Sequence, residues 1–151
     1  MTGFTVVRHI AARPSIVFDA LTTADGIASW WGPHALPVVH AEIDARVGGG
    51  YRVHFRTLDG RDHQAVGEIL EIDPPTRLIM TYRYTLGGEP IEDGRVSLIQ
   101  IDLAPVDGGV DLTFNHTGLA NAESVVSHTN GWTGALDKLV QNFGAGGERQ
   151  T

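Results

Sequence analysis

Two histidines stand out in this 151-residue sequence as side chains that could do chemistry near neutral pH. His116 ends a run in which apolar and polar residues alternate, and His128 precedes Trp132 by one helical turn. If both side chains face one interior space, they could orient a ligand carbonyl or phenol, or one could act as a base. The alternative is a structural role, in which each imidazole satisfies nearby backbone or loop groups. No carboxylate stands at an obvious spacing to orient either ring, and this favours the structural alternative.

Aromatic side chains form the second set of candidates. Trp31, beside Gly32-Pro33-His34, is suited to the mouth of a pocket, whereas Trp132 in the middle of a helical segment is more simply explained as core. The candidate hydroxyl groups of a cavity belong to Tyr51, Tyr82 and Tyr84. Their alternative is an inward-facing aromatic layer whose hydroxyls are satisfied elsewhere.

The sequence predicts no metal and no cofactor. It has seven histidines but no His-Glu-x-x-His motif, and we expect His54 and His63 to flank a hairpin on its polar face. Gly48-Gly49-Gly50 precedes a strand and lacks the Lys-Ser/Thr of a phosphate-binding loop, so we interpret it as a strand connection.

One long amphipathic helix is predicted over residues 121–143 from the helical spacing of its apolar residues. Asn121 can cap its start, and Gly144 is expected to end it. Gly131 and Gly134 are poor helix formers, so we expect them to permit close approach of another backbone or to leave room beside Trp132.

The rest of the chain predicts a sheet that this helix covers. A first strand over 3–11 is followed by two short helices, which open at Pro14 and at Ala24. Asp59-Gly60 predicts a tight hairpin within the region that follows. Six further strands with short turns between them are expected over 37–45, 51–58, 63–72, 77–86, 95–104 and 110–117. The predicted fold is therefore α+β, with a seven-stranded antiparallel sheet and one long C-terminal helix.

Alternation along the predicted strands places aromatic and aliphatic side chains on one face of the sheet, with a few hydroxyls and imidazoles among them. Such a face suits either a ligand pocket or a plain core. The inward rows include Tyr51, Val53 and Phe55; Leu78, Met80, Tyr82, Tyr84 and Leu86; Ile99, Ile101 and Leu103; and Val110, Leu112, Phe114 and His116.

Composition bounds the function classes. The net charge of −7 argues against nucleic acid as a partner, and the absence of cysteine excludes disulfides and thiolate chemistry. No apolar run is long enough to span a membrane, and the N-terminus lacks signal-peptide features, so we expect a cytoplasmic protein. We expect one domain over residues 1–145 and a flexible tail over 146–151.

Several segments together resemble a known family. They are ARPSIVFDALTT at 12–23, WWGP at 30–33, DARVGG at 44–49, GEILEIDPPTRLIMTYRY at 67–84, LAPVDGGVDLTFNHTGL at 103–119 and HTNGWTGALDKL at 128–139. In order and spacing the chain resembles the START-like (SRPBCC) superfamily, and within it the AHSA-type homologues of the activator of heat-shock-protein-90 ATPase. The resemblance implies a helix-grip fold, in which a curved sheet wraps around the C-terminal helix with a cavity between them.

The superfamily includes lipid and hormone carriers, polyketide cyclases, drug-sequestering resistance proteins and co-chaperone domains, so fold analogy alone cannot choose a reaction. The leading hypothesis is a binding module for a small hydrophobic molecule, such as a lipid, a phenolic or a polyketide-like compound. The alternatives are a cyclase, dehydratase or hydrolase that uses the same cavity, and a co-chaperone-like interaction domain. We expect neither nucleic-acid binding nor membrane insertion, and homodimer formation is left open.

The predicted pocket has a volume of roughly 300–1,000 Å³. Its predicted lining consists of Trp31, Tyr51, Phe55, Met80, Tyr82, Phe114, His116, His128 and Trp132.

Overall fold

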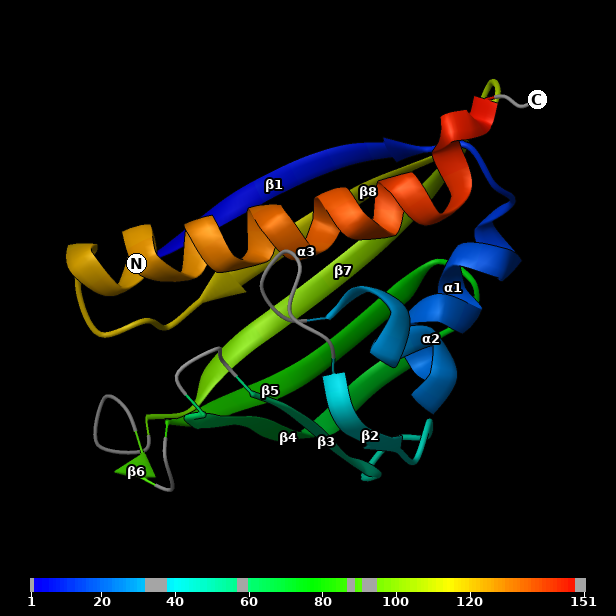
Figure 1. Cartoon of the computed structure of the whole chain (residues 1–151). Helices are drawn as coiled ribbons and strands as arrows, with labels where there is room; N and C mark the ends of the chain where they lie inside the picture. Colours follow the sequence, from blue (N-terminus) through cyan, green and yellow to red (C-terminus); the bar gives the residue numbers. More distant parts are fainter. Residues whose placement is uncertain (1, 32–37, 57–59, 87–88, 91–94, 149–151) are drawn as a thin grey trace.

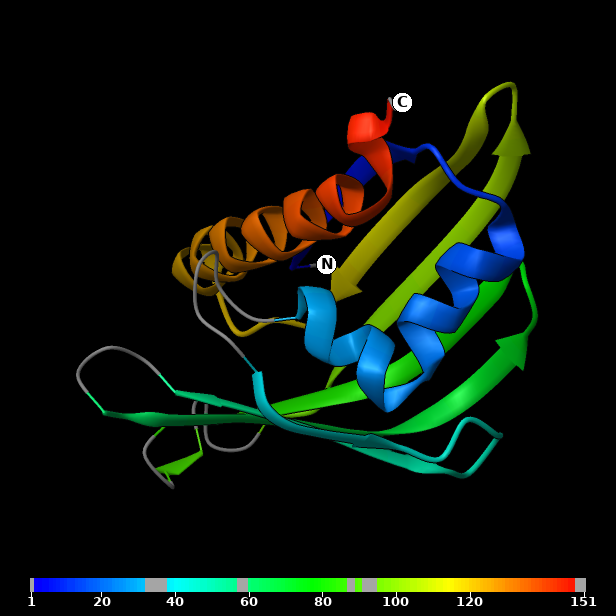
Figure 2. The ribbon, with the colours of Figure 1, turned by 45° about the vertical axis from the view of Figure 1, so that its right-hand side comes forward.

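A curved antiparallel sheet bends around a long C-terminal helix, and two short helices stand beside that helix (Figures 1 and 2). The structure is a computed structural model that describes residues 2–31, 38–56, 60–86, 89–90 and 95–148. Gly32, Pro33 and His34, which the sequence placed beside Trp31, lie outside the described residues.

The sheet contains seven main strands in the order β1-β8-β7-β5-β4-β3-β2, and every neighbouring pair is antiparallel. A two-residue strand, β6, adds to β5 off this path. The predicted seven-stranded α+β fold is confirmed, with β6 as the element that the sequence did not indicate. The strands are β1 Gly3–Ile10, β2 Val38–Ile43, β3 Gly50–Arg56, β4 Asp62–Asp73, β5 Arg77–Leu86, β6 Glu89–Pro90, β7 Ser97–Val106 and β8 Gly109–Thr117.

The helices begin at the predicted residues. Helix α1 spans Pro14–Thr22 with proline in its first turn, and α2 spans Ala24–Trp30 with the Thr23 hydroxyl accepting a hydrogen bond from the Gly26 amide at 3.1 Å. Helix α3 spans Ala122–Glu148, and Asn121 Oδ1 caps it by accepting from the Ser124 amide at 2.9 Å.

The predicted end of the last helix at Gly144 is wrong, because α3 continues to Glu148. Glycine costs about 1 kcal/mol relative to alanine in a helix but does not remove the amide donor. Once a helix is formed, each added residue contributes one further hydrogen bond, so the backbone ladder can pass through Gly144.

Polar contacts hold the C-terminal half of α3 against its neighbours. Arg8 Nε of β1 donates to Asp137 Oδ1 at 3.0 Å, and Asn142 Nδ2 donates to the Ser29 carbonyl of α2 at 3.2 Å. The backbone of α3 comes closest to β1 and α2, and Figure 1 shows the helix running alongside β1. Large side chains therefore bridge the wider span between α3 and the strands on the β5 side of the sheet.

Glycine at position 67 leaves room for the Tyr51 side chain, which extends from β3 past β4 to β5. Tyr51 pairs with Gly67 in the β3–β4 register, and its hydroxyl donates to the Thr81 carbonyl of β5 at 2.6 Å. A Cβ atom on Gly67 would lie 2.6 Å from Tyr51 Cε2 and 2.0 Å from the Thr81 carbonyl oxygen. No other residue type fits there without displacing the tyrosine or the strand.

Two other glycine predictions have different outcomes. Gly60 has φ of 82°, the left-handed backbone that the predicted hairpin requires, while Asp59 lies outside the described residues. Gly131 is exposed, and a Cβ atom built on it would meet nothing within 4 Å. The expectation that Gly131 faces a closely approaching backbone is therefore wrong.

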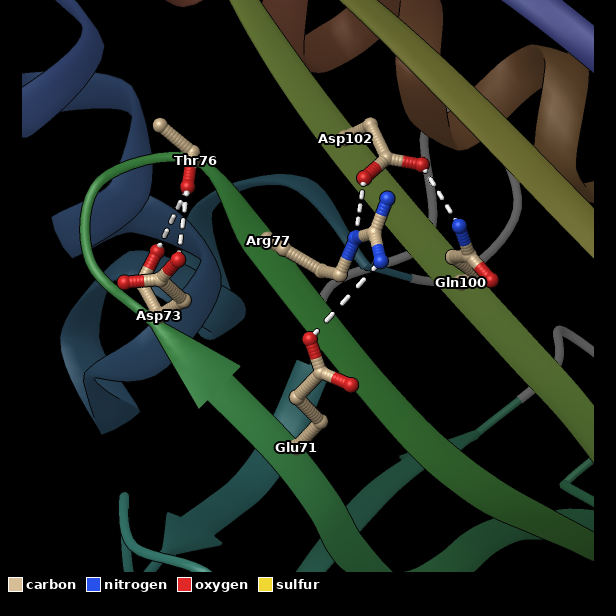
Figure 3. Close-up of polar contacts among 6 residues, drawn as sticks. All are labelled: Glu71, Asp73, Thr76, Arg77, Gln100 and Asp102. Carbon is tan, nitrogen blue, oxygen red and sulfur yellow. Dashed lines mark hydrogen bonds and ion pairs between the residues drawn. The ribbon is translucent and has the colours of Figure 1, made fainter.

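The outer face of the sheet carries a polar cluster that joins three neighbouring strands (Figure 3). Arg77 Nε donates to Asp102 Oδ1 at 2.7 Å, and its Nη1 lies 3.8 Å from Glu71 Oε2. Gln100 Nε2 donates to the second oxygen of Asp102 at 2.8 Å. Because Arg77 and Asp102 are also register partners, these contacts support the alignment of β4, β5 and β7 on the side away from α3.

Candidate functional site

The predicted lining residues come together on the concave face between the sheet and α3. Eight of them are buried and His128 is half-buried. They are supplied by the end of α2 (Trp31), by β3 (Tyr51, Phe55), by β5 (Met80, Tyr82), by β8 (Phe114, His116) and by α3 (His128, Trp132). The side chains that the strand pattern and the helix pattern predicted to face inward thus form one layer between the sheet and α3.

The deep end of this layer is formed by close ring contacts. The ring centroids of Trp132 lie 4.7 Å from Phe114 and 4.8 Å from Trp31, and Trp31 lies 5.8 Å from Tyr51. These separations are those of aromatic rings in contact. Lys138 Nζ also donates to the Trp31 carbonyl at 3.3 Å, so α3 holds this residue from two sides.

The other end of the layer consists of tyrosines and imidazoles. Tyr82 lies 4.7 Å from His116 and 5.8 Å from His128, and the two imidazoles are 5.2 Å apart between centroids. Phe55 joins this end through Tyr84, at 6.2 Å. Met80, 2% exposed, belongs to the same buried core.

His116 uses both of its ring nitrogens within the protein. Trp132 Nε1 donates to His116 Nδ1 at 3.1 Å, and His116 Nε2 lies 2.7 Å from the Ser97 hydroxyl. The Ser97 hydroxyl donates in turn to the Tyr82 carbonyl at 3.3 Å. An indole can only donate, so Nδ1 carries the lone pair and Nε2 carries the proton. Burial, together with the neighbouring His128, lowers the pKa of His116 to about 3, which keeps the ring neutral at physiological pH.

His128 has a different environment. Its Nδ1 atom lies 2.9 Å from the Ser124 carbonyl oxygen, one helical turn earlier, and 3.2 Å from the Ser124 hydroxyl. A carbonyl oxygen only accepts, so Nδ1 donates and carries the proton. In the neutral ring Nε2 is then an acceptor.

Three further residues belong to this region: Ser97, Tyr84 and His63. The sequence prediction missed Ser97 and placed His63 on the other face, whereas it named Tyr84 as a candidate cavity hydroxyl but left it out of the predicted lining. Ser97 is 5% exposed and continues the inward row of Ile99, Ile101 and Leu103 at period two, a signal that could have identified it. Tyr84 is half-buried, and its hydroxyl is hydrogen-bonded to His63 Nδ1.

The expectation that His63 lies on the polar face of the hairpin is wrong. His63 is the register partner of Phe55, and the two rings stack with centroids 4.8 Å apart. Opposed residues on paired strands point to the same face, so His63 shares the inward face with Phe55. His54 does lie on the outward face, where its Nε2 is 3.1 Å from Asp62 Oδ1.

Two surface pockets open on the outer face of the sheet. One, of about 730 Å³, is lined by outward residues that include Arg52, Val66 and Arg83, and the other, of about 230 Å³, lies beside Val96 and Leu98. The predicted pocket on the concave face remains a prediction. Among the residues that the structure describes, no three His, Asp or Glu side chains are grouped as a metal ion would require.

Comparison of the sequence with known protein families identifies the family of this chain. The family model for activator of Hsp90 ATPase homolog 1-like proteins (AHSA1) matches residues 11–144. The chain belongs to this family. The resemblance carried by the sequence motifs is therefore confirmed.

Solved structures agree with this assignment. The AHSA1 protein from Silicibacter pomeroyi is similar with a TM-score of 0.82 at 23% identity, over 93% of this chain and 96% of that one. A protein from Chromobacterium violaceum has a TM-score of 0.76 at 26% identity, over 95% of this chain and 98% of that one. The AHSA1-like protein from Aeromonas hydrophila has a TM-score of 0.76 at 21% identity, over 93% and 90% of the two chains. No curated protein matches the sequence.

The described helices of this AHSA1-type domain include none that is long and apolar enough to cross a membrane.

Proposed function

We propose that this AHSA1-type protein binds a small, mostly apolar molecule between the concave face of its sheet and α3. The observation that carries the proposal is the change in the aromatic layer along β5. Tyr82 is 6% exposed, whereas its inward neighbour Tyr84 is half-buried, and Tyr84 lies beside the half-buried His63 and His128. An apolar interior that ends at a few oriented polar groups is typical of a site for a small molecule.

Two further features support a ligand site at this place. The backbone of α3 lies close to β1 and α2, so side chains rather than close backbone contacts fill the distance to β5. Tyr82 and Tyr84 present nearly parallel rings, with centroids 6.0 Å apart and an angle of 15° between their planes. A flat apolar molecule would find stacking surfaces there. Membership of the AHSA1 family also supports a ligand-binding domain.

The partner we propose is a lipid, a phenolic or a polyketide-like compound, in a pocket of roughly 300–1,000 Å³. The test is a thermal-shift screen of these three classes, followed by calorimetric titration of the compounds that stabilise the protein. A ligand selective for the native state raises the melting temperature with its concentration. We expect no such shift with duplex DNA, because the chain carries 18 acidic against 11 basic residues.

A matched pair of variants on β5 locates the binding site. Tyr82→Leu removes an inward ring and should weaken affinity, whereas Arg83→Ala removes the next, outward side chain and should leave affinity unchanged. Arg83 lines the outer pocket of about 730 Å³, so loss of binding in Arg83→Ala alone would assign the ligand to the outer face. A screen without any stabilising compound would refute the binding function itself.

A further inference from the structure

His128 has one ring nitrogen committed and one available. The bond from Nδ1 to the Ser124 carbonyl, at 2.9 Å, fixes the proton on Nδ1. Nε2 is the ring nitrogen more distant from the helix backbone, and in the neutral ring it carries a lone pair. Within the part of the chain that the structure describes, no residue donates a hydrogen bond to His128 Nε2. A half-buried acceptor of this kind needs a donor from water or from a ligand.

The groups around His128 restrict the kind of ligand that can bring a hydrogen-bond donor to Nε2. The imidazole stands nearly perpendicular to Tyr82 and Tyr84, at angles of 79° and 75° and centroid distances of 5.8 and 6.5 Å. His116 lies on a further side at 5.2 Å, but both of its nitrogens already have protein partners. The rings around His128 are thus aromatic, and the Tyr84 hydroxyl and both His116 nitrogens already have partners within the protein.

We propose that the ligand of this site carries a hydroxyl group on a flat apolar body, as a phenol does, and that His128 Nε2 accepts the hydrogen bond from this hydroxyl. The inference rests on the proposed function and narrows its ligand class. A ligand carbonyl or ether oxygen would turn a lone pair toward the lone pair of Nε2, so neither can replace the donor. An acceptor at Nε2 therefore selects hydroxyl compounds over their carbonyl and ether analogues.

A pair of probes in which an O-methyl group replaces the hydroxyl donor tests this selection. The pair is para-phenylphenol and its methyl ether, which share the same two rings, and binding of each is measured by isothermal titration calorimetry. In the wild-type protein the phenol should bind about 2- to 10-fold more tightly than the ether, the effect of one hydrogen bond. Equal or reversed affinities would overturn the inference while leaving the binding function intact.

Two variants test whether the preference for the phenol over the ether depends on His128 Nε2. His128→Leu should bind the ether as the wild type does and lose the preference for the phenol. Ser124→Ala is the matched control, because it removes the hydroxyl but keeps the carbonyl that orients Nδ1, so it should retain the preference. Persistence of the phenol preference in His128→Leu, or loss of ether binding in that variant, would contradict the role of Nε2. If His128→Leu does not fold, the wild-type comparison still decides between a donor-selective site and a merely apolar one.

Binding of neither probe, together with no hit in the screen, would instead remove the proposed function on which the inference depends.

Discussion

Protonation of one buried side chain, His116, should contribute to the destabilisation of this protein by acid. The ring is 0% exposed, its nitrogens are bonded to Trp132 and Ser97, and burial with the nearby His128 lowers its pKa from 6.5 to about 3. The unfolded chain takes up a proton near the ordinary histidine pKa, while the native protein does not until the pH is far lower. The contribution of His116 to stability is therefore complete above pH 6.5 and is lost as the pH falls toward about 3.

The size of the effect follows from linkage. Between the two pKa values the unfolded state holds one more proton, so the free energy of unfolding falls by about 1.4 kcal/mol for each pH unit. Lowering the pH from about 6 to about 4 should thus remove about 2–3 kcal/mol through this residue alone. With a urea dependence on the order of 2 kcal/mol per molar, the unfolding midpoint should move by about 1 M.

The assay is urea unfolding at a series of pH values for the wild type and for His116→Gln, which does not titrate. Subtracting the two pH profiles cancels the surface carboxylates and the other histidines, and leaves the slope that belongs to His116. His9→Gln, which removes a histidine whose side chain is 51% exposed and lies beside Asp111, is the control for the loss of an imidazole at the surface. Parallel profiles for the wild type and His116→Gln would refute the buried neutral histidine.

Five further substitutions test side-chain packing, the space at two glycines and the ion pairs of the outer face. Trp132→Ala should cost about 3–5 kcal/mol in urea unfolding, because the indole is buried, whereas Val126→Ala, at a position 61% exposed on the same helix, should change stability by less than about 0.5 kcal/mol. Gly131→Ala should stabilise by about 1 kcal/mol, since its Cβ meets nothing, while Gly67→Ala should destabilise, since its Cβ would lie 2.0 Å from a backbone carbonyl oxygen. Arg77→Gln should lower the melting temperature more at low than at high salt, because its ion pairs on the outer face are open to screening.

Periodicity is why so much of the fold could be predicted from the sequence. Alternation along β3 and β8 and helical spacing in α3 depend on local backbone geometry, so Tyr51, Phe114 and Trp132 could be assigned to one face before any tertiary contact was known. The signals that start the helices are equally local, since Pro14 opens α1 and Asn121 caps α3.

The errors concern properties that depend on distant partners. The use of Gly131 depends on what lies next to that position of α3, and a Cβ atom built there meets nothing within 4 Å. His63 was assigned by its neighbours in sequence, but its register partner Phe55 decides its face. No role was predicted for Gly67, because that role depends on the Tyr51 ring of the adjacent strand. The hydrogen-bond partners of His116, namely Ser97 and Trp132, likewise come from other elements, so the sequence alone left the role of His116 open. His128 bonds within its own helix, but the rings that surround it come from β5 and β8.

The sequence could not distinguish the roles of His116 and His128. Substitutions at the two positions should have different effects on stability and on ligand affinity. His116→Phe leaves the Trp132 indole N–H without its acceptor, so it should lower the free energy of unfolding by about 1–3 kcal/mol. His128→Leu loses only a bond to a carbonyl that the helix already uses, so stability should change by less than about 1 kcal/mol while the affinity for a phenol falls. Urea unfolding and calorimetric titration of both variants measure the two effects on the same proteins. If His128→Leu is the severely destabilised variant and His116→Phe the one that loses affinity, the roles assigned from their nitrogen partners are reversed, and the ligand must be bound from the β8 side of the layer.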